Sequence, residues 1–264
     1  MQHDFPYNRR HYEEARNFGG DCWTPKDQRR LETVCTLTPG EAKTILDVGS
    51  GGGEFVTALR NKGYDVVATD YSAAAMSLYG GERVLCSGAA LPFADRSFDM
   101  VTCTEVLEHL DDKQLARALG EIARLARLYV LISVPNNEDL NQSLVKCGAC
   151  GEHYTLYGHV QAFTPETMDH LLPGFNVVRK DFGDEEVGYN RLLLCVRQRT
   201  GGRWAYWDCA ICPTCGEQPP RPGRRGIVAL GCDFLNNRIP WRPRRRTPMY
   251  VLYKRTDSTN PPAD

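Results

Sequence analysis

The sequence predicts an α/β fold with a doubly wound, mostly parallel sheet of seven strands. Two observations support this prediction: short apolar segments alternate with segments of helical period, and a glycine-rich turn joins a strand to a helix. Two Cys-x-x-Cys pairs in irregular segments predict, in addition, a zinc-knuckle cap built from inserts. The chain has 264 residues, of which 42% are hydrophobic and 25% charged, so it is long enough for one large domain with insertions.

The regular pattern begins after residue 40 and continues to residue 134. Buried strands and amphipathic helices follow one another in this region, which is typical of βαβ units. We expect strands at 43–48, 64–70, 82–86, 98–103 and 128–134, and helices at 53–63, 72–80 and 105–125.

After Pro135 the pattern becomes irregular. Residues 135–163 are rich in Asn, Gly, Cys, His and Tyr, and we predict that they form an insert. A helix is expected at 164–172, because Thr164 suits an N-cap and Pro165 suits the first helical position. Further strands are expected at 174–182 and 247–255.

Composition argues against several classes of protein. The longest apolar stretch, Leu128–Val134, is far shorter than the roughly 18–20 residues of a membrane-spanning helix. Residues 1–10 are polar and charged, unlike a secretion signal, so we expect a cytoplasmic protein without a membrane partner. The 11 cysteines, an odd number, then favour reduced thiols or metal ligands over disulfides.

A glycine-rich turn marks the first candidate site. Glycines 49, 51, 52 and 53 follow a strand and precede a helix, where the missing Cβ atoms let the backbone turn tightly and approach a ligand. Asp47 lies in this motif, where its charge would repel a pyrophosphate but would accept hydrogen bonds from the ammonium group of a methionine moiety. Asp70, at the end of the second strand, is placed to accept hydrogen bonds from ribose hydroxyls.

Three segments, ILDVGSGGGEF, VVATDYS and LPFADRSFDMVTCTEVLEHL, resemble successive motifs of the class I S-adenosylmethionine-dependent methyltransferases. The resemblance covers residues 43–134 and implies a Rossmann-like fold with S-adenosylmethionine as cofactor. It implies that Asp47, Gly49 and Gly51 would hold the methionine end of the cofactor and that Asp70 would hold the ribose. The adenine would be held by Tyr71, Ser87, Gly88 and Ala89, and Thr104 and Glu105 would lie beside the sulfonium.

Two positions within the resemblance need comment. Ser87 stands where relatives often carry Asp, so we expect the contact with the adenine amino group to be weaker or to come from the backbone. His109 matches a frequent residue of the family, and we favour a role in bracing the cofactor loop over a role in catalysis.

The segments KCGACG and CPTCG each contain a Cys-x-x-Cys-Gly knuckle. One tight turn can present both thiolates of such a pair to the same ion, so two knuckles predict a structural zinc site formed by Cys147, Cys150, Cys212 and Cys215. Cys209 and His153 are competing ligands. A redox dithiol is less well supported, because neither pair opens a helix after a strand.

The zinc hypothesis also bears on the topology. If the segment NRLLLCV, 190–196, were the seventh strand, Cys212 would not readily reach Cys150, whereas a seventh strand at 247–255 leaves 183–246 as an excursion on the cofactor side. We favour the second arrangement. It divides the chain into a helical lid of residues 1–40, a core of 41–134, 164–182 and 247–255, a zinc-binding cap of 135–163 and 183–246, and a tail of 256–264.

Methyl transfer by direct in-line displacement depends on alignment and desolvation, and it needs a base only when the acceptor arrives protonated. The candidate catalytic groups on the cap are His153, Tyr157 and His159, and His11 and Tyr12 would reach from the lid. We expect the acceptor to be a small molecule or a biosynthetic intermediate, methylated on oxygen, nitrogen or carbon.

The basic C-terminal segment keeps a second function open. The segment from Pro219 to Arg255 contains nine arginines and one lysine but a single acidic residue, Asp233. Trp241 lies among the arginines in the sequence. They would suit the phosphates of RNA, but a solvated, proline-rich loop has the same composition. The alternatives are therefore an RNA methyltransferase that uses the cap together with Arg242, Arg244, Arg245 and Arg246, and a non-catalytic cofactor-binding scaffold, which no sequence feature favours.

Overall fold

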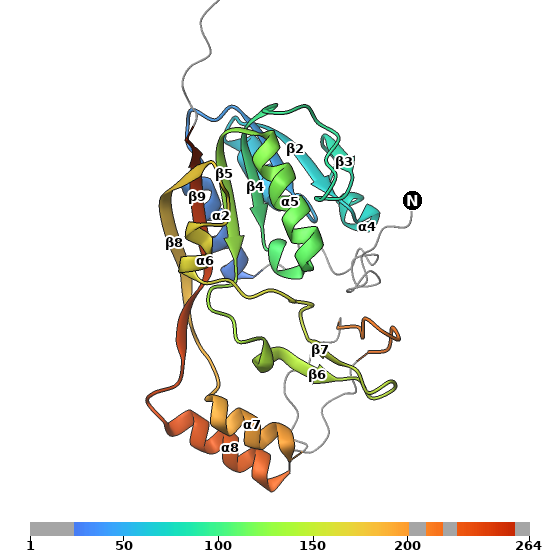
Figure 1. Ribbon diagram of the computed structural model, residues 1–264, viewed down its shortest axis with the longest axis vertical. Helices are drawn as coiled ribbons and strands as arrows, with labels where there is room; N and C mark the ends of the chain where they lie inside the picture. The colour runs from blue at the N-terminus through green and yellow to red at the C-terminus, as the bar shows by residue number, and fades with distance from the viewer. Residues whose placement is uncertain (1–23, 201–209, 219–225, 257–264) are drawn as a thin grey trace, which may run out of the picture.

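A computed structural model of the chain describes residues 24–200, 210–218 and 226–256. Its main body is a seven-stranded sheet in the order β3-β2-β1-β4-β5-β9-β8, below which Figure 1 shows a smaller region built from inserts. The strands are β1 (Thr44–Val48), β2 (Asp65–Asp70), β3 (Arg83–Leu85), β4 (Phe98–Thr104), β5 (Ala126–Val134), β8 (Phe175–Val187) and β9 (Arg244–Arg255). The first five run parallel, and β9 runs antiparallel to both β5 and β8. The predicted α/β fold with a mostly parallel sheet is confirmed.

Helices cover both faces of this sheet. They are α2 (Pro25–Leu37), α3 (Glu54–Asn61), α4 (Ala73–Met76), α5 (Asp112–Leu125) and α6 (Pro165–Asp169). Buried residues of α2, α3 and α4 share one apolar cluster with the sheet, while those of α5 and α6 belong to the cluster on the other face. Val34 and Leu37 place the second half of α2 in the core, although the sequence assigned residues 1–40 to a lid. Residues 1–23 lie outside the described part of the chain.

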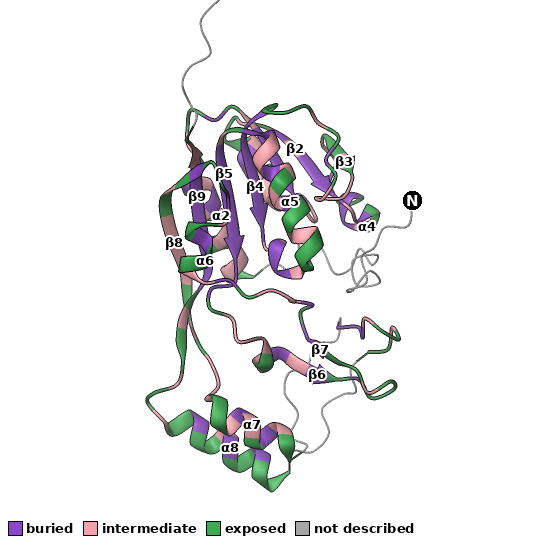
Figure 2. Cartoon of the chain, viewed as in Figure 1, coloured by how far each residue is buried: buried purple, intermediate pink, exposed green. Residues whose placement is uncertain are grey.

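Strand β5 shows why the sheet forms where it does. Val130 and Ile132 pack on the α5 side, and Tyr129 and Leu131, which alternate with them, pack on the α2 side. An apolar run that is buried on both faces is typical of a central strand in a parallel sheet. Figure 2 shows the resulting layer of buried strands between partly exposed helices.

The helical region predicted at 105–125 contains two elements rather than one continuous helix. A 3-10 turn, η3 (Leu107–His109), is followed by a break, and α5 begins after Asp111. The Asp111 carboxylate accepts a hydrogen bond from the backbone N–H of Gln114 at 2.8 Å, and the Gln114 side chain accepts one from the backbone N–H of Asp111 at 3.3 Å. This capping box starts a new helix and leaves η3 as a separate turn at the end of β4.

The segment Thr247–Arg255 does lie in the sheet, as the last part of β9. The competing segment forms a helix, α7 (Arg191–Arg199), because the Asn190 side chain accepts hydrogen bonds from the backbone N–H groups of Leu192 and Leu193. A second helix, α8 (Ile227–Arg238), packs against it. The sequence analysis did not predict this helical pair.

The other insert forms a small hairpin. It contains a 3-10 turn, η4 (Leu140–Ser143), and two short antiparallel strands, β6 (Leu144–Lys146) and β7 (His153–Thr155). Figure 1 shows the hairpin beyond the carboxyl end of β4. No helix in the described ranges is long and apolar enough to cross a membrane.

Candidate functional site

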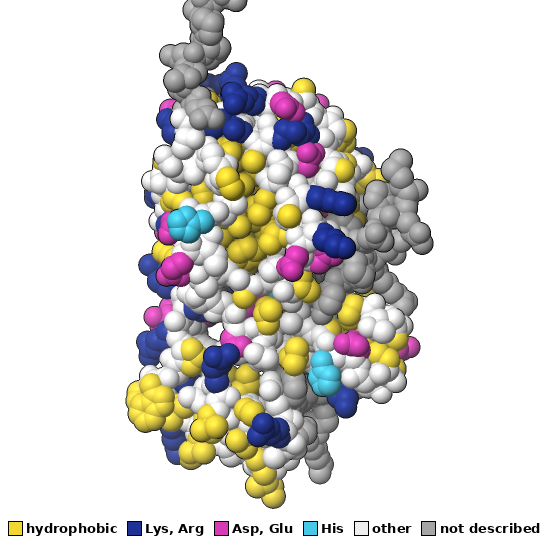
Figure 3. Space-filling view, in the orientation of Figure 1, with side chains coloured by type: hydrophobic (Ala, Val, Ile, Leu, Met, Phe, Trp, Pro, Cys, Tyr) yellow, Lys and Arg dark blue, Asp and Glu magenta, His cyan; other side chains and the backbone are white. Residues whose placement is uncertain are grey.

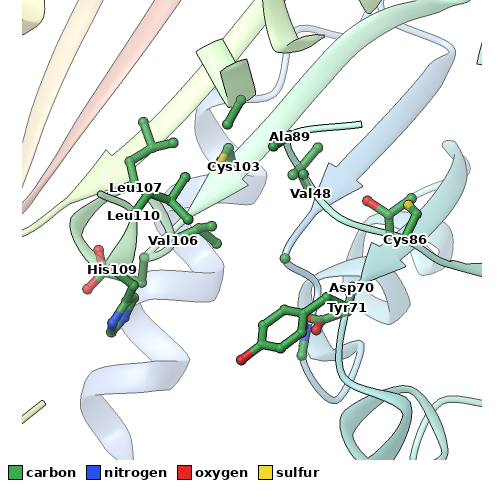
Figure 4. Close-up of a pocket in the computed structure, with 16 residues that line it drawn as sticks. Val48, Asp70, Tyr71, Cys86, Ala89, Cys103, Val106, Leu107, His109 and Leu110 are labelled. Carbon is green, nitrogen blue, oxygen red and sulfur yellow. Dashed lines mark hydrogen bonds between the residues drawn. The ribbon is translucent and has the colours of Figure 1, made fainter. Parts of the chain in front are cut away.

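A cavity opens at the carboxyl ends of β1, β2 and β4. In Figure 4, Asp70 and Tyr71 at the end of β2 face Val106, Leu107 and His109 across it. The remaining wall comes from the ends of β1, β2 and β4, the turn after β1, the loop after β3, the residues on either side of η3 and the middle of α5: Val48, Gly49, Gly51, Thr69, Cys86, Gly88, Ala89, Cys103, Glu105, Leu110 and Ala118. In open parallel sheets, ligands bind at this edge of the strands.

The turn after β1 requires glycine for reasons of both conformation and space. Gly49 and Gly51 have φ angles of +76° and +53°, which belong to the left-handed region that disfavours side chains. A Cβ on Gly49 would lie 2.3 Å from Cγ2 of Val106. The turn therefore brings bare backbone to the edge of the cavity.

Asp70 joins this turn to the end of β2. Its Oδ2 accepts a hydrogen bond from the backbone N–H of Gly51 at 2.9 Å, and its Oδ1 accepts one from that of Ser72 at 2.8 Å. Burial raises the pKa of Asp70, and backbone hydrogen bonds from Ser72, Gly51 and Tyr71 act in the opposite direction. Each carboxylate oxygen has a second lone pair, so the fixed side chain retains capacity to accept from hydroxyl groups in the cavity.

Asp47 lies within β1, and it does not contribute to the cavity wall. The side chain is 1% exposed, and its Oδ1 accepts a hydrogen bond from the Thr102 hydroxyl at 2.6 Å. Its Oδ2 has no hydrogen-bond partner in the described part of the structure. Burial raises the pKa of Asp47 to about 6, against the effect of the Thr102 hydrogen bond.

Most of the other residues proposed to bind the cofactor line the cavity, but two of them do not. Lining the cavity are Gly49, Gly51, Asp70, Tyr71, Gly88, Ala89, Glu105 and His109, whereas Ser87 and Thr104 do not line it. The Ser87 hydroxyl accepts a hydrogen bond from the backbone N–H of Ala89 at 3.2 Å, so it shapes its own loop. The sequence analysis missed the apolar wall of Val48, Cys86, Cys103, Val106, Leu107 and Leu110, of which the buried strand pattern of β1 and β4 gave the only signal.

Glu105 directly follows β4 and has a left-handed conformation, with φ of +55°. Its carboxylate accepts hydrogen bonds from the Ser133 hydroxyl at 2.7 Å and from the Arg30 guanidinium at 3.1 Å. A non-glycine residue in this region is unfavourable unless its surroundings hold it, and such residues cluster at functional sites. Glu105 thus fixes the direction in which η3 leaves the sheet.

Two histidines meet at the opening of the cavity. His109 of η3 and His159 of the insert lie with ring centroids 4.8 Å apart and planes at 76°, and the Tyr157 ring is 5.8 Å from that of His159. Nδ1 of His159 is 2.6 Å from Oε2 of Glu138. Of the three candidate catalytic residues, the structure therefore brings His159 and Tyr157 together beside His109, while His153 is exposed on β7 opposite Lys146.

The four cysteines of the two knuckles also come together. The Sγ atoms of Cys147 and Cys215 are 3.5 Å apart, those of Cys150 and Cys212 are 3.6 Å apart, and all four lie within 4.8 Å of one another. The knuckles share a fold: Gly151 donates its N–H to the carbonyl of Cys147, and Gly216 donates to that of Cys212. His153 is not part of this group, and Cys209 lies outside the described residues.

Comparisons with known proteins agree with this geometry. Residues 46–128 match a family model described as a methyltransferase domain. An uncharacterized methyltransferase from Mycobacterium sp. (strain JLS) is 36% identical over 193 residues, which cover 68% of this chain and 74% of that protein. The chain belongs to the S-adenosylmethionine-dependent methyltransferases.

Another relative is similar in sequence, and a solved structure is similar in fold. An uncharacterized methyltransferase of Mycobacterium tuberculosis is 37% identical over 179 residues, covering 63% of this methyltransferase and 62% of that protein. The fold is similar to that of a SAM-dependent methyltransferase from Archaeoglobus fulgidus, with a TM-score of 0.53 and 20% identity over 86% of this chain and 92% of the other. The matched residues 46–128 of the methyltransferase contain the glycine turn, Asp70 and η3, but neither the cysteines of the knuckles nor His159.

Proposed function

We propose that this methyltransferase transfers a methyl group to a small molecule that binds between the cofactor cavity and the insert containing His159. The observation that carries the proposal is the contact between His109, which lines the cofactor cavity, and His159, which comes from that insert. An acceptor that reaches the cavity at this point would meet imidazole and phenol side chains.

S-adenosylmethionine would supply an activated methyl group on its sulfonium. The residues present fit it: Asp70 has lone pairs for the ribose hydroxyls, and the bare backbone of Gly49 and Gly51 permits the close approach of a ligand. For Asp47, the unpaired Oδ2 supports a role toward an ammonium group, although the side chain lies behind the cavity wall. The loop at Gly88 and Ala89 supports an adenine site on the β3 side, where Tyr71 also lies.

The chain's own groups would align the acceptor and handle its proton. His159 and Tyr157 lie beside the opening, and Glu138 holds Nδ1 of His159. This leaves Nε2 of His159 to accept a proton from a hydroxyl or amine acceptor. The transfer itself requires an in-line approach to the methyl group, which the cavity walls would impose.

We infer that the four cysteines bind a structural zinc ion. In a tetrahedral site with Zn–S bonds of about 2.3 Å, the sulfur atoms are separated by about 3.8 Å. The two cross-knuckle distances of 3.5 and 3.6 Å are close to this separation. Around the cysteines only a small buried cluster of Val145, Tyr154, Leu156 and Ala210 forms, so a metal ion would supply much of the stability of this region.

The alternative of an RNA substrate relies on arginines that already make contacts with other residues of the chain. Arg244 pairs with Glu185 and Arg245 with Glu186, both at 3.2 Å across β8 and β9. Arg246 donates hydrogen bonds to the carbonyls of Gly183 and Phe182. Arg221, Arg224 and Arg225 lie outside the described residues.

The surface formed by α7 and α8 exposes apolar side chains as well as basic ones. On α8, Ile227, Leu230, Phe234 and Leu235 are exposed, and Figure 3 shows hydrophobic side chains gathered at the end of the molecule that α7 and α8 form. A demethylmenaquinone methyltransferase of Corynebacterium urealyticum, 35% identical over 116 residues that cover 46% of that protein, supports a small-molecule acceptor as well.

The proposal is tested by incubating the protein with cell extract and S-adenosylmethionine that carries a radiolabelled methyl group. The extract is separated into a small-molecule fraction, a protein fraction and an RNA fraction, and an Asp70→Ala variant serves as the control that should not label. We expect label in the small-molecule fraction that resists ribonuclease. Label confined to RNA would replace the proposal with the RNA alternative, and cofactor binding without any transfer would favour the scaffold.

A further inference from the structure

Glu108 of η3 is a buried acid that the proposed function does not use. The residue is 1% exposed, and neither Oε1 nor Oε2 has a hydrogen-bond partner in the described parts of the chain. Buried polar groups nearly always have partners, and an unpaired buried carboxylate is strongly unfavourable. The carboxylates of Glu105 and Glu138 lie near enough to act on it, and together they outweigh the opposing charge of Arg30, so the surroundings are negative. Such a site is suited to a bound cation.

The residues around Glu108 are metal-binding types. Glu108, His109 and His159 each offer one ligand atom, and these atoms lie within 4.8 Å of one another. The backbone of the insert is fixed over η3, because Val160 and Gln161 donate their N–H groups to the carbonyl oxygen of Glu108 at 2.7 and 3.1 Å. The three side chains are therefore held together by two elements far apart in the sequence.

His159 has the environment that a metal-bound histidine needs. Its Nδ1 lies 2.6 Å from Oε2 of Glu138, whose side chain is only 7% exposed. A carboxylate on one ring nitrogen fixes the tautomer and the ring orientation, and it leaves Nε2 as the ligand atom. This contact and the unpaired oxygens of Glu108 are two independent observations, and both indicate a bound metal ion.

We propose that Glu108, His109 and His159 bind a divalent transition-metal ion at the opening of the cofactor cavity. Two imidazoles and one carboxylate suit ions such as Zn²⁺, Mn²⁺ or Fe²⁺, and three protein ligands leave coordination positions open. This site shares no residue with the four-cysteine group.

The location of the ion indicates which class of acceptor would bind. His109 and Glu105 both line the cofactor cavity, so an open coordination position lies next to it. A hydroxyl group bound to the ion would lose its proton to solvent more readily, and its oxygen would be held toward the cavity. With the ion bound, Nε2 of His159 would be a ligand, so the ion and not His159 would activate the acceptor. This step rests on the proposed function, and it makes the acceptor an oxygen nucleophile that can bind a metal ion.

Titration of the full-length protein with Mn²⁺, followed by electron paramagnetic resonance of the free ion, tests the site without any need for turnover. Mn²⁺ prefers oxygen and nitrogen ligands, so the cysteine group does not interfere. We expect one Mn²⁺ per chain, with at least tenfold weaker binding in Glu108→Gln and His159→Ala and roughly ten- to hundredfold weaker binding in Glu138→Gln. His170→Ala, which changes an exposed histidine at the end of α6, should bind Mn²⁺ like the original protein.

Absence of stoichiometric Mn²⁺ binding, or equal affinity in Glu108→Gln, His159→Ala and the original protein, would overturn the proposal. Binding of S-adenosylmethionine by the same variants, measured calorimetrically without metal, shows that they are folded. If Glu108→Gln does not fold, His159→Ala and Glu138→Gln decide the question. If the original protein binds Mn²⁺ but not S-adenosylmethionine, the metal site is supported and the proposed function is refuted. If it binds S-adenosylmethionine but not Mn²⁺, the metal site is refuted and the proposed function is not affected.

Discussion

The carboxylate of Asp70 accepts a hydrogen bond from the backbone N–H of Gly51 at 2.9 Å, which ties the end of β2 to the turn after β1. Two segments that each contribute to the cavity are thus held by one side chain. The same carboxylate is bound by the N–H of Ser72, so its orientation is set before any ligand enters.

Replacing Asp70 should therefore weaken cofactor binding strongly. Asp70→Ala removes a proposed acceptor for the ribose and frees the N–H of Gly51, so we expect affinity for S-adenosylmethionine to fall about tenfold or more, or roughly 1.4 kcal/mol. Calorimetric titration measures the change. Asp65→Ala, at the exposed other end of β2, is the matched control and should bind normally. Equal affinity in both variants would remove Asp70 from the site.

A pair of glycine substitutions should have opposite effects. Gly49→Ala places a Cβ 2.3 Å from Val106 at a φ of +76°, so we expect the free energy of unfolding to fall by about 2 kcal/mol or more. Gly120→Ala lies in the exposed middle of α5 with no atom within 4 Å of the new Cβ, and it should gain about 1 kcal/mol from helix propensity. Chemical denaturation measures both. A tolerated Gly49→Ala with normal cofactor binding would show that the turn does not need glycine there.

The parts of the fold that the sequence predicted are those set by local patterns. The glycine turn, Asp70 and the apolar strands lie within short segments, and the residue types of each segment favour one local structure. The break at Asp111 was also encoded locally, by the capping box with Gln114, but it was overlooked within a longer helical pattern. The apolar run from Leu192 suited a strand and a helix equally, and the Asn190 cap decides for the helix.

The rest depends on contacts between distant residues. Arg245 looked like a free basic residue, because only the pairing of β8 with β9 brings Glu186 beside it. In the same way, nothing near Glu108 in the sequence indicates that His159 will lie next to it. Sequence spacing identified the cysteine knuckles, because two residues between ligands form a recognisable turn, but it contained no such signal for the group at η3.

The stability of the cofactor-free protein should depend on Asp47. Its pKa is raised by burial from 3.8 to about 6, so between these values the folded state holds more protons than the unfolded state. Stability therefore falls as the pH rises from about 4 to 6, and it is constant above this range as far as Asp47 is concerned. Asp47→Asn removes this part of the pH dependence and should raise the free energy of unfolding at neutral pH, on the order of 2 kcal/mol.

Denaturation of both proteins across this pH range measures the effect. The original protein and Asp47→Asn should converge at low pH, where Asp47 is protonated in both states. If Asp47 also contacts the cofactor ammonium, the stabilised variant should bind S-adenosylmethionine more weakly. A variant that is less stable at neutral pH would show that the ionised carboxylate has a partner that compensates for its burial.

Removing two cysteines should release the metal and loosen only the insert. As purified, the protein should contain about one zinc per chain bound by the four cysteines, and Cys212→Ser/Cys215→Ser should lose that ion, because a site with two of four ligands binds zinc far more weakly. The small buried cluster of Val145, Tyr154 and Leu156 depends on the ion, so backbone amides of β6 and β7 should exchange hydrogen faster. Strands β4 and β5 belong to a separate core cluster and should keep their protection.

Elemental analysis and hydrogen exchange followed by mass spectrometry measure the two effects, with Cys35→Ser/Cys195→Ser as the control outside the knuckles. A folded original protein that contains no zinc and yet protects β6 and β7 would show that packing alone holds the two knuckles together.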